Sequence, residues 1–198
     1  MNLDCRKSLE VGLSSWVIQD GNYGDFERGA VCAFALEFWP GTELAPCPDG
    51  AASAPRLDFV RGCTYAVRGQ ILFKGADWFA LDAGVGMYCC NVIPPRARIG
   101  DWVQGDVSVF IDHFSYFESL SREAGAPPLI YDWQIASVSL ETTPWIQKRP
   151  RYWERDQERT SWREVVRTNA WEDDSGNGFY VLSCDRQPGA ARHRRNPN

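Results

Sequence analysis

Two segments of this chain, 64–74 and 101–111, alternate strictly between apolar and polar side chains. Each has a glycine in the middle of its apolar row, Gly69 in the first and Gly105 in the second. Strict alternation predicts a half-buried strand, because successive side chains of a strand point to opposite faces of the sheet. A glycine in the buried row is typical of a strand that bends sharply or lies against another backbone, as at the corner of a small barrel. The two segments therefore predict a coiled β-sheet.

Most of the remaining pattern also predicts strands. They are expected at 14–19, 30–39, 78–83, 86–92, 129–141, 163–171 and 179–184. Turn-forming residues separate the first two of these and the last two, so we expect an N-terminal and a C-terminal β-hairpin. The apolar parity changes within 129–141, which indicates a bulge near Ala136 and Ser137. The sequence thus predicts one all-β domain spanning 1–198.

Three segments do not fit a strand pattern. Residues 115–124 predict a short helix, which Gly125 and the two prolines that soon follow would end. Residues 40–56 hold four prolines and are expected to form a long surface loop. Residues 186–198 are polar and are expected to form a solvated tail.

The central part of the chain, about residues 62–141, resembles an OB-fold, a five-stranded Greek-key barrel. The resemblance rests on Gly69 within 64–74, on the adjacent strand 78–83 and on the run GDWVQGDV at 100–107. In the OB-fold a helix lies between the third and fourth strands, whereas the helical stretch here follows the fourth. The resemblance implies an OB-like barrel, extended in this chain by the two terminal hairpins and one or two short helices.

Charge is distributed unevenly along the chain, whose net charge is −5. Residues 148–164 carry six basic and four acidic groups, and residues 185–198 carry four basic groups and one acidic group. These segments contribute +2 and +3, so the remaining body carries −10. An acidic body repels nucleic-acid phosphates and attracts basic partners. We therefore expect a protein partner and regard nucleic acid as disfavoured.

Cysteine usage and hydropathy indicate a cytoplasmic protein. The seven cysteines are odd in number, irregular in spacing and form no C-x-x-C motif, which favours reduced thiols in a reducing compartment. No apolar run is long enough for a membrane helix. Asp4, Arg6, Lys7 and Glu10 stand where a signal peptide would carry its apolar segment.

The residue types needed for common catalytic sites are scarce. Only two histidines occur, so a Ser-His-Asp or Cys-His arrangement would have to be built on His113, beside Asp112. Cys89 and Cys90 are adjacent and would point to opposite faces of a strand, which disfavours zinc. We assign no catalytic residue, metal or cofactor. The carboxylates leave a hydrolase with paired acids open. They are Asp82, Asp101, Asp106, Asp112 and Asp132.

The most regular charged pattern is a set of arginines spaced four apart, with aromatic residues among them. The candidate binding residues are Arg151, Arg155, Arg159, Arg163, Trp153, Trp78 and Trp102. Arginines interleaved with aromatic rings are typical of single-stranded nucleic-acid sites. Acidic residues stand between these arginines, however, and favour a solvated helix or loop with internal salt bridges.

The sequence therefore supports a principal hypothesis and two alternatives. The principal hypothesis is a non-enzymatic, cytoplasmic, bacterial binding module whose acidic surface meets a protein, such as an immunity-type inhibitor of a basic toxin. The first alternative is an OB-type binder of single-stranded nucleic acid or oligosaccharide, with several of Trp78, Trp102, Tyr131 and Trp153 exposed on one face. The second alternative is the carboxylate-dependent hydrolase.

Overall fold

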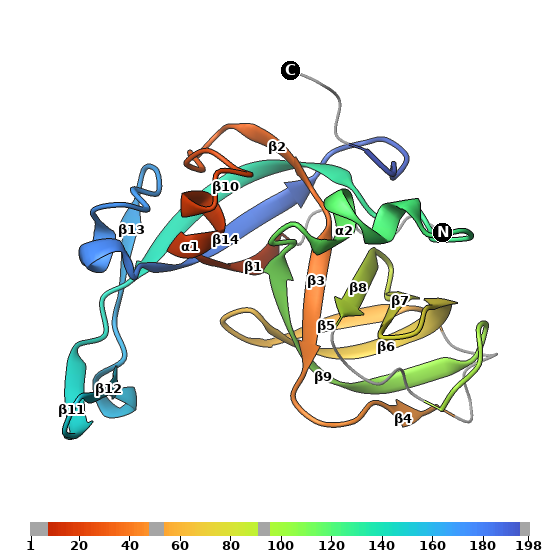
Figure 1. The fold of residues 1–198 in the computed structure, drawn as a ribbon, viewed down its shortest axis with the longest axis horizontal. Coiled ribbons are helices and arrows are strands. Elements are labelled where there is room, and N and C mark those ends of the chain that lie inside the picture. The colour runs from red at the N-terminus through yellow and green to blue at the C-terminus, as the bar shows by residue number, and fades with distance from the viewer. Residues whose placement is uncertain (1–7, 48–53, 91–95, 195–198) are drawn as a thin grey trace.

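The structure, a computed structural model, describes residues 8–47, 54–90 and 96–194 (Figure 1). Strands dominate these residues, and they form one twelve-stranded sheet and a separate two-stranded sheet. The helical segments are short: α1 (Ser15–Gln19), α2 (Ser115–Glu118) and the 3-10 turns η2 (Leu120–Arg122), η3 (Gln157–Arg159) and η4 (Asp173–Gly176). The predicted all-β class is confirmed.

Five strands of the large sheet close into a barrel, which confirms the predicted barrel. In order around the barrel they are β6 (Thr64–Lys74), β7 (Trp78–Asp82), β8 (Gly86–Cys90), β3 (Leu36–Pro40) and β9 (Trp102–Ile111). Neighbours are antiparallel except for β3 and β8, which are parallel. The pairing of β9 with β6 closes the ring.

The two strands with central glycines lie side by side in this barrel. Gly69 is opposite Val103, and Gly105 is opposite Val67. A Cβ atom on Gly69 would lie 2.8 Å from the carbonyl oxygen of Asp82, and one on Gly105 would lie 2.8 Å from the side chain of Leu44. The close approach of the β7 backbone therefore requires glycine at position 69, as its place in a buried row indicated, whereas Gly105 lies against the end of the Leu44 side chain.

One barrel strand comes from outside the part of the chain that resembles an OB-fold. β3 precedes β6 in the sequence, yet it lies between β8 and β9. β10 (Tyr131–Glu141) instead belongs to the part of the sheet outside the barrel. Alternation specifies which face of a strand is buried, but it does not specify the neighbouring strand.

The remaining strands extend the sheet beyond the barrel. From the outer edge the order is β13 (Trp162–Val165), β10, β14 (Phe179–Arg186) and β1 (Leu9–Ser14), which then contacts β9. Three further strands attach at the sides: β2 (Val31–Phe34) pairs with β10, β4 (Ala45–Pro46) with β9, and β5 (Arg56–Arg61) with β6. One buried apolar cluster contains side chains of both the barrel and this extension.

The partners of the terminal strands differ from those predicted. Residues 15–19 form α1 and the strand lies before them, because a short apolar run fits helical and extended periods alike. The 30–39 run divides at Ala35 into β2 and β3, which have different neighbours. β13 and β14 lie on either side of β10 rather than pairing with each other. The bulge near Ala136 is confirmed by a register shift between Ile135 and Ser137.

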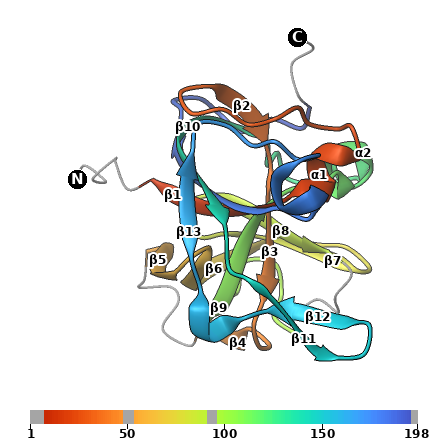
Figure 2. The same cartoon turned by 90° about the vertical axis from the view of Figure 1, so that its left-hand side faces the viewer.

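A two-stranded ribbon stands apart from the large sheet. It consists of β11 (Trp145–Arg149) and β12 (Tyr152–Arg155), which pair only with each other among the described strands. Figure 2 shows the ribbon extending away from β10 and β13. We call residues 142–161, which leave β10 and return to β13, the arm. No helix in the described ranges has the length and apolar character needed to span a membrane.

Candidate interaction surface

Tryptophan exposure is the most unusual surface property of this molecule. All nine tryptophans lie in the described residues, and six are exposed: Trp16, Trp39, Trp145, Trp153, Trp162 and Trp171. Tryptophan is highly buried on average, so an exposed large ring calls for a functional reason more than an exposed leucine does. Trp171 is the extreme case, with 70% of its surface exposed.

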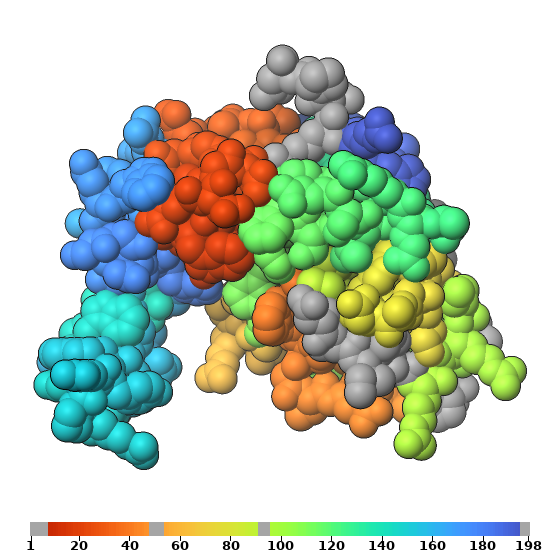
Figure 3. Space-filling model, viewed as in Figure 1, coloured from red at the N-terminus to blue at the C-terminus, as the bar shows by residue number. Residues whose placement is uncertain are grey.

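Four of these six rings belong to the arm or to the segments that adjoin it. Trp145 and Trp153 lie on the two ribbon strands, and Trp162 begins β13. Trp171 precedes η4, whose Asp174 accepts a hydrogen bond from Nε1 of Trp145 at 2.9 Å. Figure 3 shows the surface hollowed between the arm and the barrel, so the arm offers accessible area on more than its tip.

Arg155 joins the arm to the turn at η4. Its guanidinium donates to the carbonyl oxygen of Thr143 at 2.6 Å and to Oδ2 of Asp174 at 2.6 Å. It also lies 4.2 Å from the centre of the Trp145 ring. Only 12% of the side chain is exposed. Arg155 is one of the predicted binding residues, and in the structure its donors hold the ribbon to η4, which is a structural role.

The other three predicted arginines do not share one helical face. Arg151 lies in the ribbon turn at a φ of 63°, Arg159 ends η3 and Arg163 lies on β13. Arg159 pairs with Asp156 at 2.5 Å, an internal salt bridge of the kind that the interleaved acids favoured. Arg151 and Arg163 are exposed. The spacing of four therefore spreads these side chains over a turn, a 3-10 segment and a strand.

The predicted aromatic residues have three different environments. Trp153 is 54% exposed, whereas Trp78 is 1% exposed and donates from Nε1 to Glu123 at 2.6 Å. Trp102 and Tyr131 are partly buried. Trp78 lies among buried side chains of β7, β8 and α2, so it offers no surface to a ligand. These four residues do not form a common exposed face.

Sequence reasoning missed Trp145 and Trp171 as surface residues. Their exposure follows from the position of Trp171 in a turn and from the ribbon having no covering element among the residues that the structure describes. Neither property is encoded locally. The available signal was the polar sequence on both sides of the prolines that flank residues 145–149, which is unusual for a buried hairpin.

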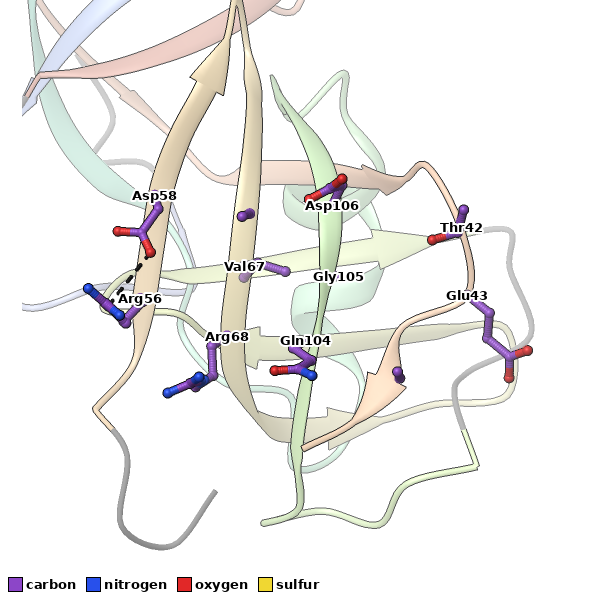
Figure 4. Close-up of a pocket in the computed structure, with 11 residues that line it drawn as sticks. Thr42, Glu43, Arg56, Asp58, Val67, Arg68, Gln104, Gly105 and Asp106 are labelled. Atoms are coloured by element: carbon purple, nitrogen blue, oxygen red, sulfur yellow. Dashed lines mark ion pairs between the residues drawn. The ribbon is translucent and has the colours of Figure 1, made fainter. Parts of the chain in front are cut away.

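A polar pocket of about 410 Å³ lies on the outer surface of the barrel (Figure 4). Its principal polar lining comes from three adjacent strands: Arg56, Asp58, Arg68, Gln104 and Asp106. Ala66, which is opposite both Asp58 and Asp106, and Gly105 also line the pocket and contribute little bulk. The pocket is charged with both signs, so it suits polar or ionic groups rather than an apolar ligand.

His113 belongs to a chain of polar contacts beside α2. Its Nδ1 lies 2.5 Å from Oε2 of Glu37, and its Nε2 lies 3.2 Å from Oγ of Ser115. The other oxygen of Glu37 accepts from Sγ of Cys90 at 3.2 Å. Hydrogen bonding to Glu37 is the main cause of a raised pKa at His113. The order carboxylate, imidazole, hydroxyl is that of a catalytic triad.

The surroundings of Ser115 favour a structural role for this cluster. The backbone N–H groups of Phe114, Tyr116 and Phe117 all donate to the carboxylate of Asp112. Because these N–H groups already donate to Asp112, they are not available to stabilise an oxyanion formed at Ser115. Asp112 also accepts from the hydroxyl of Tyr88 at 2.5 Å. The cluster thus fixes the start of α2 to the barrel.

The thiols and carboxylates have equally defined surroundings. Burial raises the pKa of Cys89 and of Cys90 to about 12, so both remain protonated at neutral pH and are poor nucleophiles. Asp132 forms a bidentate pair with Arg192 at 2.5 and 2.8 Å. Within the described ranges, no three His, Cys, Asp or Glu side chains are close enough to hold a metal ion.

Function must be inferred from these arrangements themselves. Comparison of the chain with protein-family models, with curated proteins and with solved structures finds no match.

Proposed function

We propose that this protein is a non-enzymatic binding module whose arm contacts a protein partner. The exposure of Trp145, Trp153, Trp162 and Trp171 on and beside one projecting ribbon is the observation that carries the proposal. Each ring keeps a large apolar surface in water that a partner could bury. Tryptophan, tyrosine and arginine are also the residues that most often dominate the binding energy of protein interfaces.

The charge of the rest of the chain, rather than that of the arm, favours a partner with a basic surface. The arm holds five basic and three acidic residues and therefore carries +2, which leaves −7 on the rest of the chain. A basic protein is attracted by the acidic remainder, and this attraction raises the association rate. An immunity-type inhibitor that covers a basic bacterial toxin has these properties. No disulfide joins any two of the described cysteines, which suits the cytoplasm.

Affinity purification with arm variants tests this proposal. We expect a specific protein to co-purify with the wild type and to be lost from the double variant Trp153→Ser, Trp171→Ser. Val31→Ser serves as the control, because Val31 is an exposed apolar residue on β2, outside the arm. Circular dichroism should show all three proteins folded. If no protein co-purifies at any salt concentration, or if the double variant retains the same protein in full, the proposal fails.

Single-stranded nucleic acid is the second candidate partner. The same ribbon presents Tyr152, Trp153, Lys148, Arg149 and Arg151. Bases stack on exposed aromatic rings while cations contact the phosphates. This candidate predicts that a fluorescent oligothymidine gains anisotropy on binding and loses it as salt rises. Absence of binding at low salt would exclude it.

A further inference from the structure

β5 is an open edge of the large sheet. It is the last strand in the sheet order and pairs only with β6 among the described strands. Phe59 and Val60 are about half exposed on it. In the described part of the chain, no backbone group of Arg56–Arg61 bonds to anything on the side away from β6. Such an edge can accept a further strand, and proteins usually cover or shorten it.

Two rows of charge cross the sheet next to this edge, on the face that carries the pocket (Figure 4). In the first row Arg56 is opposite Arg68, which is opposite Gln104. In the second row Asp58 is opposite Ala66, which is opposite Asp106. The rows are two residues apart along each strand, so they are separated by about 7 Å.

In the basic row, only Arg56 has an ion-pair partner among the described residues, and that partner is Asp58 of the acidic row (Figure 4). Like charges directly opposite each other destabilise an antiparallel pair, yet Arg56 and Arg68 occupy such positions. The nearest acid to Arg56 is Asp58 at 3.6 Å, and both side chains are largely exposed. Arg68 makes no ion pair with any residue whose position the structure describes. An acidic side chain placed beside Arg56 would relieve this repulsion.

The acidic row has space for a cation. Ala66 is short and stands between Asp58 and Asp106 in this row, so it leaves the pocket open between the two carboxylates. A lysine or arginine that extended from a strand beside β5 could lie over Ala66 with its charge between these two carboxylates. The long apolar stem of such a side chain suits a surface made of small residues.

We infer that the edge of β5 binds an extended segment of a protein, with an acidic residue opposite Arg56 and a basic residue opposite Asp58. Backbone hydrogen bonds to β5 supply the pairing, and the two charged side chains supply the register. This inference extends the proposed protein-binding function to a second surface. It is tested with synthetic peptides and does not depend on the arm.

Chemical-shift mapping with four peptides tests the inference. The probe is acetyl-Thr-Val-Glu-Val-Lys-Val-Thr-amide, compared with versions that carry Glu at both charged positions, Lys at both, or N-methyl groups on alternate residues. We expect the probe to shift the amide signals of β5 and to bind the wild-type protein at least tenfold more tightly than the Lys-Lys and N-methylated peptides. Binding should persist in the Trp153→Ser, Trp171→Ser variant, which separates this site from the arm.

A charge reversal provides the specificity test. Asp58→Lys should change the preference from the mixed probe to the Glu-Glu peptide, because both positions beside β5 then carry positive charge. Asp77→Lys, which makes the same charge change in the turn before β7, should leave the wild-type preference unchanged. The inference is overturned if β5 signals do not move, if all four peptides bind equally, or if the N-methylated peptide binds as well as the probe.

Discussion

At the scale of single residues, the pairing of Glu37 with His113 has a direct consequence for pH dependence. Glu37 is buried, and its hydrogen bond to Nδ1 raises the pKa of His113, with a smaller contribution from the nearby Asp112. The folded state therefore holds this proton more tightly than the unfolded state, in which the pKa of a histidine is about 6.5. The stabilisation is complete below that pH and is lost as pH rises through the higher pKa of the folded state.

Denaturant unfolding across this range should show the effect. We expect the free energy of unfolding of the wild type to fall as the pH is raised from 6 to 9, and His113→Gln to remove much of this dependence. At pH 6 the variant should be less stable by about 1–3 kcal/mol, because a buried carboxylate loses a charged hydrogen-bond partner. Parallel pH profiles for the two proteins would show that His113 does not make this contribution.

Gly69 supports a second prediction at the residue scale. A Cβ atom there would lie 2.8 Å from the carbonyl oxygen of Asp82 and 2.9 Å from the Leu81 side chain, so the backbone of β7 would have to move. We expect Gly69→Ala to lower the free energy of unfolding by about 1–3 kcal/mol. Gly24→Ala is the matched control, since nothing lies within 4 Å of its added methyl group. Equal stability of the two variants in thermal melts would contradict this account.

At the scale of elements, strict alternation predicted two of the five strands that form the barrel. The segments 64–74 and 101–111 correspond to β6 and β9 within one residue. The 30–39 run was less informative because it is apolar on both faces, and it contributes to two strands with different neighbours. The period of the apolar pattern indicates which face of a strand is buried. Which strand lies beside it depends on contacts between residues that are distant in the sequence.

For the predicted site residues too, the sequence pattern did not indicate the surroundings of each side chain in the fold. Trp78 and Trp153 both stand in short strands, but β7 is buried on both faces, whereas β11 and β12 contain no fully buried residue. Arg155 was grouped with three other arginines by spacing alone. Its partner Asp174 lies 19 residues away, across a turn that no local pattern predicts. The stretch of chain that holds the arm was therefore predictable as a surface region, but the role of each side chain was not.

We predict that Arg155 stabilises the ribbon. A two-stranded hairpin is marginally stable alone, and Arg155 supplies its main attachment to η4. Arg155→Ala should speed amide hydrogen exchange in β11 and β12, with little change in the barrel strands. Arg159→Ala is the control, because Arg159 is largely exposed and a surface ion pair such as that with Asp156 contributes little to stability. Uniform acceleration throughout the protein would instead mean that Arg155 stabilises the whole fold.

At the scale of the whole molecule, β9 connects the barrel to the rest of the sheet. It pairs with β6 and β3 inside the barrel and contacts β1 through Gly12 and Phe110. A Cβ atom on Gly12 would lie 2.6 Å from the Phe110 ring, so this junction is closely packed. The arm has no such junction, since it is attached through the ends of β10 and β13 and the contacts at η4.

The arm should therefore be removable without unfolding the rest. Thr142 and Ser161 close its base with a backbone hydrogen bond of 2.8 Å and paired hydroxyls, so residues 143–160 can be replaced by an Asn-Gly turn. We expect the shortened protein to lose about 1–2 kcal/mol, chiefly from the partners of Asp174, which corresponds to a fall of about 2–8 °C in Tm. It should lose the arm's partner yet still bind the mixed-charge peptide at β5. A single cooperative melt with native signals for buried Trp78 would establish that the remaining fold is independent of the arm, whereas an unfolded product would show that the arm is part of the folding unit.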